Sequence, residues 1–214
     1  MSTHNKYVYP GLEIIAAMNK DQNRFSDAGD TLADFADHFV VHCPKCDARA
    51  YINTQKRLTC PACFHVEETG HWYGAATATV QVKCRDCHRQ LFRSAPWDRQ
   101  WKKLALHCDQ CGDSCEYEAS ITRHYFDKGR KTDPVFGLPL WLQDDFRGEL
   151  FWAYNYEHLE TLRAYIAAKL RERGIAPRNT IRKNTAMVSR LPNFIKKANN
   201  REDLLKCMDN LMKK

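Results

Sequence analysis

The fold is decided by the stretch from residue 43 to residue 63, which begins Cys43-Pro-Lys-Cys46, runs on for 13 residues and ends Cys60-Pro-Ala-Cys63. The same pattern returns in Cys84-Arg-Asp-Cys87 and Cys108-Asp-Gln-Cys111, which lie 20 residues apart. Two residues between cysteines allow one tight turn to aim both sulfur atoms at a point about 2.3 Å away. Two such turns complete a tetrahedron, so we expect two four-cysteine metal sites.

Each site is expected to use two consecutive pairs. A cross-braced arrangement, in which the first pair joins the third, is the alternative, but RING-type modules keep their second and third pairs close together. Here 20 residues separate Cys63 from Cys84. Four thiolates suit either zinc or a single iron. The sequence has no flavin or nicotinamide signature, so we predict two zinc ions in closed, structural sites with the ligands Cys43, Cys46, Cys60, Cys63, Cys84, Cys87, Cys108 and Cys111.

The residues between the paired cysteines read as hairpins. Residues 48–52 and 57–59 are expected to form two strands around a polar turn. Residues 90–93 and 101–107 are expected to form the two strands of a second hairpin. With the knuckles CPKC, CPAC, KCRDC and HCDQC, this arrangement resembles the zinc ribbons of transcription factors, polymerase subunits and rubredoxin-like proteins over residues 40–118. The segments LPLWL (138–142), FWAYN (151–155) and LPNFIKKANNRED (191–203) make the rest similar to uncharacterised bacterial zinc-ribbon proteins.

Several other residues could in principle join the sites. Cys115 lies close enough to Cys111 to replace a ligand, but a small buried group is the simpler reading, and Cys207 sits among leucines and methionines of a predicted helix. Histidines also gather near the cysteine pairs. We expect them to surround the sites rather than to bind metal: His42, His65, His71, His88 and His107.

The fold class expected is α+β, with two tandem zinc-ribbon hairpin modules followed by a mainly helical C-terminal region. Residues 1–42 are expected to hold a short amphipathic helix over 31–41, residues 43–70 the first ribbon, and residues 71–128 a linking strand (77–82) and the second ribbon. Residues 129–214 form an aromatic-rich and basic C-terminal region.

Within that C-terminal region, an aromatic block over 136–156 is expected to form strands and core. A helix is predicted from Tyr156 to Arg173, with Asn155 at its start and Gly174 at its end. A last helix is predicted from Arg201 after an Asn200 cap.

Charge is unevenly distributed along the chain. Residues 169–201 contain ten lysines and arginines and one acid, Glu172, whereas the whole chain carries a formal charge of +7. Such a basic segment favours contacts with nucleic-acid phosphates, although a solvated surface has the same composition. The expected contact residues are Arg171, Arg173, Arg178, Arg182, Lys183, Arg190, Lys196 and Lys197.

No catalytic motif stands out. Nucleophile elbow, P-loop, Rossmann glycine pattern and HExxH are all missing, and the carboxylates Asp144, Asp145 and Glu149 fit a surface as well as a metal site. The sequence therefore favours a zinc protein that binds nucleic acid over an enzyme. The alternative is a protein-interaction adaptor, regulator or immunity-type protein of a bacterial toxin or defence system, with the ribbons as staples.

The location expected is the cytoplasm. We find no export signal near the start of the given sequence, and no stretch approaches the roughly 18 apolar residues of a membrane helix. A reducing compartment favours metal binding over disulfides for paired cysteines.

Overall fold

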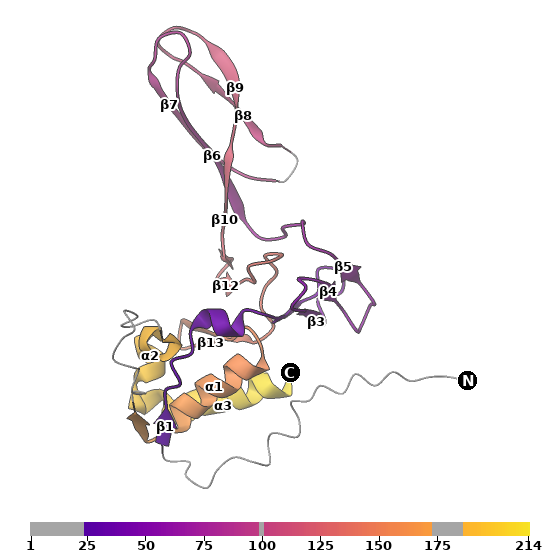
Figure 1. The fold of residues 1–214 in the computed structure, drawn as a ribbon, viewed down its shortest axis with the longest axis vertical. Coiled ribbons are helices and arrows are strands. Elements are labelled where there is room, and N and C mark those ends of the chain that lie inside the picture. Colours follow the sequence, from indigo (N-terminus) through magenta and orange to yellow (C-terminus); the bar gives the residue numbers. More distant parts are fainter. Residues whose placement is uncertain (1–23, 99–100, 173–185) are drawn as a thin grey trace, which may run out of the picture.

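The computed structural model describes residues 24–98, 101–172 and 186–214. It is an α+β structure in two parts (Figure 1). One part, which we call the arm, comprises the described residues between 76 and 123 and projects from the rest (Figure 1). The other part, which we call the body, comprises the remaining described residues and includes the first ribbon and all the helices.

The first ribbon is a four-stranded antiparallel sheet with the order β2-β3-β4-β5. Its strands are β2 (Phe39–His42), β3 (Arg49–Ile52), β4 (Leu58–Thr59) and β5 (Val66–Glu67). The predicted hairpin between the first two cysteine pairs is the β3–β4 pair, in which Tyr51 lies opposite Thr59. The cysteine pairs themselves form the turns between β2 and β3 and between β4 and β5.

The arm is built from two hairpins and one added strand. Strand β6 (Ala76–Lys83) pairs along its length with β7 (Gln90–Pro96), and β10 (Ser120–Arg123) adds to the other edge of β6. Strand β8 (Lys103–His107) pairs with β9 (Ser114–Glu118). The strands predicted at 90–93 and 101–107 are therefore present, but they do not pair with each other. Strand β7 pairs with β6 and strand β8 with β9, both of which lie outside the insert.

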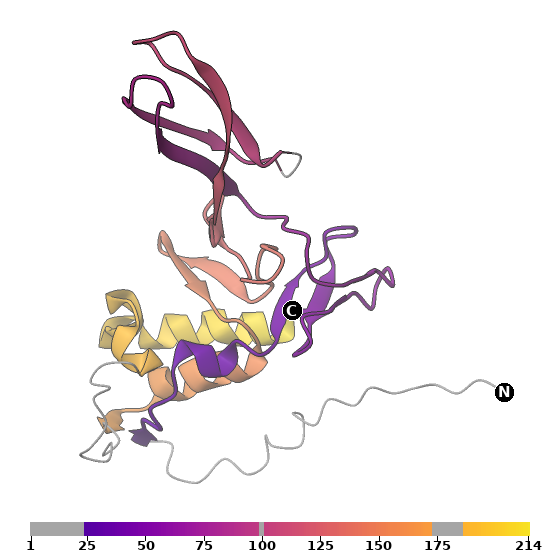
Figure 2. The ribbon, with the colours of Figure 1, turned by 45° about the horizontal axis from the view of Figure 1, so that its top comes forward.

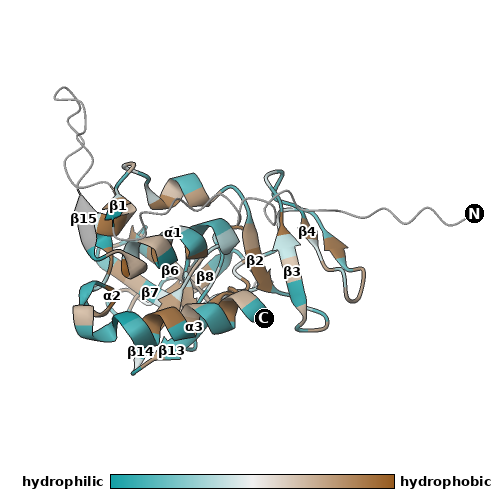
Figure 3. Cartoon of the chain, turned by 90° about the horizontal axis from the view of Figure 1, so that it is seen from below, coloured by the Kyte–Doolittle hydropathy of each residue, from teal (hydrophilic) through white to brown (hydrophobic). Residues whose placement is uncertain are grey.

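The C-terminal region begins with two small hairpins, β11–β12 and β13–β14, followed by helix α1 and then by helical segments that end in α3. In Figure 2 the β13–β14 hairpin lies over α3. Figure 3 shows α1 and α3 side by side, and Arg163 on α1 contacts Asp209 on α3 at 3.0 Å. The bounds are β11 (Phe126–Asp127), β12 (Arg130–Lys131), β13 (Gln143–Phe146), β14 (Glu149–Trp152), α1 (Tyr156–Ala167), η3 (Met187–Arg190), α2 (Asn193–Lys196), η4 (Ala198–Asn200) and α3 (Arg201–Lys213).

Two predicted helices are shorter than expected. The helix predicted over 31–41 is a single 3₁₀ turn, η2 (Leu32–Phe35), and the following residues form β2. Helix α1 begins after Asn155, whose side chain accepts from the His158 N–H as predicted, but ends at Ala167. Residues 170–172 instead form β15 (Leu170–Glu172), parallel to β1 (Arg24–Ser26). In both places strand pairing replaces helix, with the neighbouring β3 in the first case and with the distant β1 in the second. Gly174, the predicted stop, lies outside the described residues.

The described residues form two hydrophobic cores. The larger core lies in the body and includes Val41, Cys43 and Leu58 of the first ribbon together with Phe136 and Leu162 of the C-terminal region. The smaller core lies in the arm around Val80, Leu91, Leu104 and Leu106. The first ribbon is therefore packed into the body, whereas the second ribbon has a core of its own. The aromatic block predicted as strand and core supplies much of the larger one.

Trp72 anchors the chain where it leaves the body for the arm. Its indole is 1% exposed, and its Nε1–H donates to the Ala75 carbonyl at 3.2 Å. The neighbouring Tyr73 N–H donates to the Phe136 carbonyl at 2.6 Å. Gly137 follows with φ +73°, and a Cβ there would lie 2.8 Å from the Trp72 ring and 2.7 Å from the Gly74 nitrogen. Only glycine fits at position 137, where the chain passes against Trp72 and Gly74.

Gly137→Ala tests this anchor. We expect the free energy of unfolding to fall by about 3 kcal/mol, from about 1 kcal/mol of left-handed backbone cost and about 2 kcal/mol of overpacking. Gly129→Ala is the matched control, because Gly129 has φ +77° and nothing within 4 Å of the added Cβ. Chemical denaturation measures the free energy of unfolding of both variants. If both lose the same amount, the close approach to Trp72 does not require glycine at position 137.

Candidate metal centres

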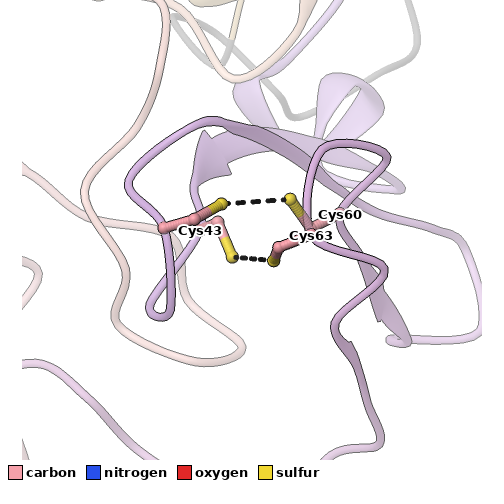
Figure 4. Close-up of side chains that lie close together, drawn as sticks. Cys43, Cys60 and Cys63 are labelled. Atoms are coloured by element: carbon pink, nitrogen blue, oxygen red, sulfur yellow. Dashed lines mark hydrogen bonds between the residues drawn. The ribbon is translucent and has the colours of Figure 1, made fainter.

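The eight paired cysteines gather into two groups of four, and each group uses consecutive pairs. In the first group the Sγ atoms of Cys43 and Cys63 lie 3.6 Å apart, as do those of Cys46 and Cys60 (Figure 4). In the second group the corresponding distances, Cys84 to Cys111 and Cys87 to Cys108, are both 3.5 Å. All four sulfur atoms of each group lie within 4.8 Å of one another.

These distances fit zinc. A tetrahedron with zinc–sulfur bonds of about 2.3 Å has sulfur–sulfur edges of about 3.8 Å, close to the separations found. The two groups are thus compatible with two zinc ions. Four thiolates fill the coordination sphere of zinc and leave no position for a reacting water, so zinc held here acts on the structure of the chain and not on a substrate.

All four cysteine pairs share one backbone turn. The N–H of the first cysteine donates to the carbonyl five residues later, at 2.8 Å for Cys43, 2.9 Å for Cys60, 2.7 Å for Cys84 and 2.8 Å for Cys108. The residue after the second cysteine always has positive φ. These residues are Asp47 (+59°), Phe64 (+60°), His88 (+61°) and Gly112 (+77°). Glycine adopts this conformation without strain, but for other residues it costs roughly 1–2 kcal/mol.

The thiols of each group influence one another's pKa. Backbone N–H groups of Cys111 and Gln110 lower the pKa of the Cys108 thiol to about 6. For Cys46 a backbone hydrogen bond at Ala48 lowers the pKa, but the neighbouring thiols, Cys63 first, outweigh it and raise the pKa to about 12. Crowded thiolates repel one another, and a divalent cation among them removes that repulsion. The donor set is thus suited to a cation.

Other cysteines and histidines stand outside both groups. Cys115 lies on β9 with its Sγ 3.7 Å from Asp113 Oδ1, and Cys207 packs partly buried against the body core. Among the nearby histidines, His42 contacts Asp47 and His107 contacts Ser114. Within the described residues, the contacts of His42 and His107 join each ring to a side chain of the neighbouring cysteine turn.

The predicted nucleic-acid contacts are only partly described. Arg173, Arg178, Arg182 and Lys183 lie outside the described residues, and Arg171 is described only through the backbone of β15. The other three are near one another in the body. Lys196 Nζ donates to the Ser189 carbonyl at 2.8 Å, next to the exposed Arg190, and Lys197 is exposed. This segment stays a predicted contact region.

The carboxylates Asp144, Asp145 and Glu149 lie on the exposed β13–β14 hairpin. Asp145 Oδ1 accepts from the Gly148 N–H at 3.1 Å, so this carboxylate stabilises the turn. The aromatic block over 136–156 offers little apolar surface to a partner, because Phe136, Leu140, Leu142 and Phe151 are fully buried there. That block is core.

Three residues that the sequence analysis passed over have unusual surroundings. Phe64 is 85% exposed and Phe92 is 67% exposed, although phenylalanine is normally buried. His158 is the opposite case, since it is a polar residue that is 2% exposed. Strand alternation could have indicated the exposure of Phe92, since its neighbour Leu91 is the buried residue of the pair. Nothing in the sequence distinguishes Phe64 or His158.

Comparisons with family models, with curated proteins and with solved structures return no match to this chain. The assignment therefore rests on the geometry of the two cysteine groups, which is consistent with tandem zinc-binding modules. No helix within the described residues is long and apolar enough to cross a membrane.

Removing one ligand from each site is expected to have different consequences. Structural zinc contributes on the order of 10 kcal/mol, comparable to the whole stability of a domain. Cys60 belongs to the body core and Cys108 to the arm core. Cys60→Ser should therefore unfold the first ribbon and much of the body, whereas Cys108→Ser should unfold only the arm.

Metal analysis and amide hydrogen exchange measure both effects. Each variant should lose about one of the two zinc ions, and Cys115→Ser should keep both. Loss of both ions from Cys108→Ser, or protection lost throughout the body, would contradict separate sites and separate cores.

Proposed function

We propose that this protein binds single-stranded nucleic acid through the outer face of the β10–β6–β7 sheet of the arm. The observation that supports the proposal most is Phe92, whose ring is 67% exposed on this face. An exposed aromatic ring on a sheet gives a base a surface to stack on, as in many proteins that bind single strands.

The strand register defines the composition of this face. Gln81 lies opposite Phe92, and Thr79 lies between Ser94 on β7 and Ser120 on β10. Side chains on alternate positions face the other way, where Ala78 and Val80 are buried in the arm core. The outer face has hydroxyl, amide and basic groups and no carboxylate, and consists of Thr77, Thr79, Gln81, Lys83, Gln90, Phe92, Ser94, Pro96, Ser120 and Thr122.

The two hairpins of the arm carry opposite net charges, and the positive one contains β6 and β7 of the proposed surface. Residues 76–96, which include β6 and β7, contain four basic residues and one acid, a net charge of +3. Residues 103–118, which include β8 and β9, contain one basic residue and four acids, a net charge of −3. A polyanion is therefore attracted to the β6–β7 side and repelled from the β8–β9 side.

The predicted basic segment of the body is a second, separate surface in this proposal. Arg190, Lys196 and Lys197 lie around α2, at the end of the molecule away from the tip of the arm (Figure 1). Contacts there would add affinity for long strands without reading bases. Strand length therefore distinguishes the contributions of the two surfaces.

Phe92→Ala tests the sheet face. We expect the dissociation constant for a fluorescent 10-nucleotide oligothymidylate to rise about fivefold or more, since stacking of one base contributes roughly 1–3 kcal/mol. Lys83→Ala should weaken binding and lower the salt dependence by about one counterion. Fluorescence anisotropy at several salt concentrations measures both effects.

Phe64→Ala is the matched control, because Phe64 is an even more exposed phenylalanine and lies on the first ribbon. It should leave binding unchanged. Lys197→Ala should raise the dissociation constant for a 40-nucleotide strand more than that for the 10-nucleotide strand. Absence of salt-sensitive binding by the zinc-loaded protein, or equal effects of Phe64→Ala and Phe92→Ala, would refute the proposed surface.

A second candidate function, a protein-interaction adaptor or regulator, is favoured by Phe64. This residue follows Cys63, has φ +60° and is 85% exposed, and Val66 beside it is 47% exposed. The positive φ belongs to the turn that all four cysteine pairs share, so the exposed apolar surface is the feature that favours a partner. Trp141 and Trp152 give less support, because both are partly buried against the body core.

Phe64→Gly separates the second function from the first. Relief of the backbone strain should raise the free energy of unfolding by up to about 1 kcal/mol. If Phe64 anchors a partner, the same variant loses a stoichiometric complex that Phe92→Ala retains. Size-exclusion chromatography with light scattering measures the complex, and its retention by Phe64→Gly would exclude this surface.

A further inference from the structure

The body contains a pocket of about 470 Å³, and among its lining residues only Arg190 belongs to a surface proposed above. It lies between η2, β14, α1 and residues 187–195, and none of its lining residues belongs to the cysteine groups or to the arm. Most of the lining is aliphatic, namely Leu32, Leu150, Leu162, Met187, Leu191 and Ile195. Its size and apolar walls are those of a site for a small organic molecule.

One buried polar side chain, His158, lines this pocket. The Tyr154 N–H donates to His158 Nδ1 at 3.2 Å, so Nδ1 is an acceptor and the ring hydrogen is on Nε2. Burial lowers the pKa of His158 to about 4, which keeps the ring neutral at physiological pH. Among the residues that the structure describes, Nε2–H has no acceptor.

The position of the ring is fixed from several sides. The His158 N–H donates to Asn155 Oδ1 at 2.9 Å, and the Asn155 amide donates in turn to the carbonyls of Phe35 and His38. The imidazole stacks on Phe35 with ring centroids 4.9 Å apart, and the Trp152 ring meets it edge-on at 5.8 Å. The donor is therefore held in one orientation before any ligand arrives.

Two polar residues of the lining, Thr31 and Arg190, do not compete for this role. Thr31 is bonded through its N–H and its hydroxyl to the Asp34 carboxylate, at 2.7 and 2.8 Å. Arg190 is exposed to solvent. The lining also contains Trp152, whose indole has an N–H of its own. Mostly apolar walls thus surround the fixed His158 N–H, which no described protein group accepts and which gains a hydrogen bond when an acceptor enters the pocket.

We propose that this pocket binds a small, neutral, apolar molecule that carries one hydrogen-bond acceptor, and that His158 Nε2–H donates to that acceptor. A neutral imidazole in apolar surroundings favours a carbonyl or ether oxygen over a charged group, because a charge there would lose its hydration. This binding site is independent of both proposed functions.

Acetophenone and ethylbenzene form a matched pair of probes, since they have similar shape and differ in the carbonyl acceptor. With the zinc-loaded full chain, acetophenone should bind about five- to tenfold more tightly, the effect of one net hydrogen bond. Saturation-transfer NMR titrations measure both dissociation constants. The proposal is wrong if neither probe binds or if both bind equally.

Variants at two positions show whether the probes occupy this pocket. His158→Asn keeps an acceptor for the Tyr154 N–H but cannot replace the Nε2 donor, so it should abolish the preference for acetophenone. His158→Gln can present an amide N–H near the Nε2 position and should restore part of it. Ala33→Trp, at an exposed lining position, should block both probes.

Circular dichroism and zinc content check that each variant is folded. If His158→Asn does not fold, the remaining two variants decide the question. A preference for acetophenone that survives Ala33→Trp places the binding elsewhere and overturns the proposal.

Discussion

Four sulfur atoms that must converge on one point constrain the backbone around each cysteine pair. Each pair meets this demand with the same turn, in which a hydrogen bond spans five residues and the residue after the second cysteine adopts positive φ. Three of these residues are not glycine. Their strain is tolerable because metal coordination contributes far more free energy than the left-handed backbone costs.

The same turn leads to different structures in the two ribbons. In the first, the two hairpins pair with each other through β3 and β4 and lay one face on the body. In the second, the hairpins keep separate ladders, β6–β7 and β8–β9, and close a small core between them. The first ribbon is thus part of a large folding unit, whereas the second depends mainly on its own metal site and few apolar residues.

This division separates the surfaces that are free to bind. The arm exposes a sheet face that has no carboxylate and carries Phe92, and opposite charges lie on its two hairpins. The first ribbon exposes Phe64 at the strained position of its second turn. The body contains instead a mostly apolar pocket lined by an oriented imidazole. Each feature lies on a different element, so one can be altered without disturbing the others.

The sequence by itself determined the two cysteine groups and several short strands, because both depend on neighbouring residues. The spacing of Cys43 to Cys63 and of Cys84 to Cys111 predicted two consecutive four-cysteine groups, and the strands at 49–52 and 77–82 followed from local alternation. The start of α1 at Asn155 is also local, since that side chain caps the first turn.

Only the tertiary structure decided what depends on distant partners. The helix predicted over 31–41 ends at Phe35, and the residues after it form β2, which also hydrogen-bonds to the distant Pro139 and Tyr154 carbonyls. The pairing of 170–172 with 24–26 likewise accompanies the early end of α1. The exposure of Phe64 and Phe92 and the burial of His158 depend on what packs around each side chain. The physical reason is that turns and metal ligands draw their energy from adjacent residues, whereas strand pairing and burial draw it from contacts between residues far apart in the chain.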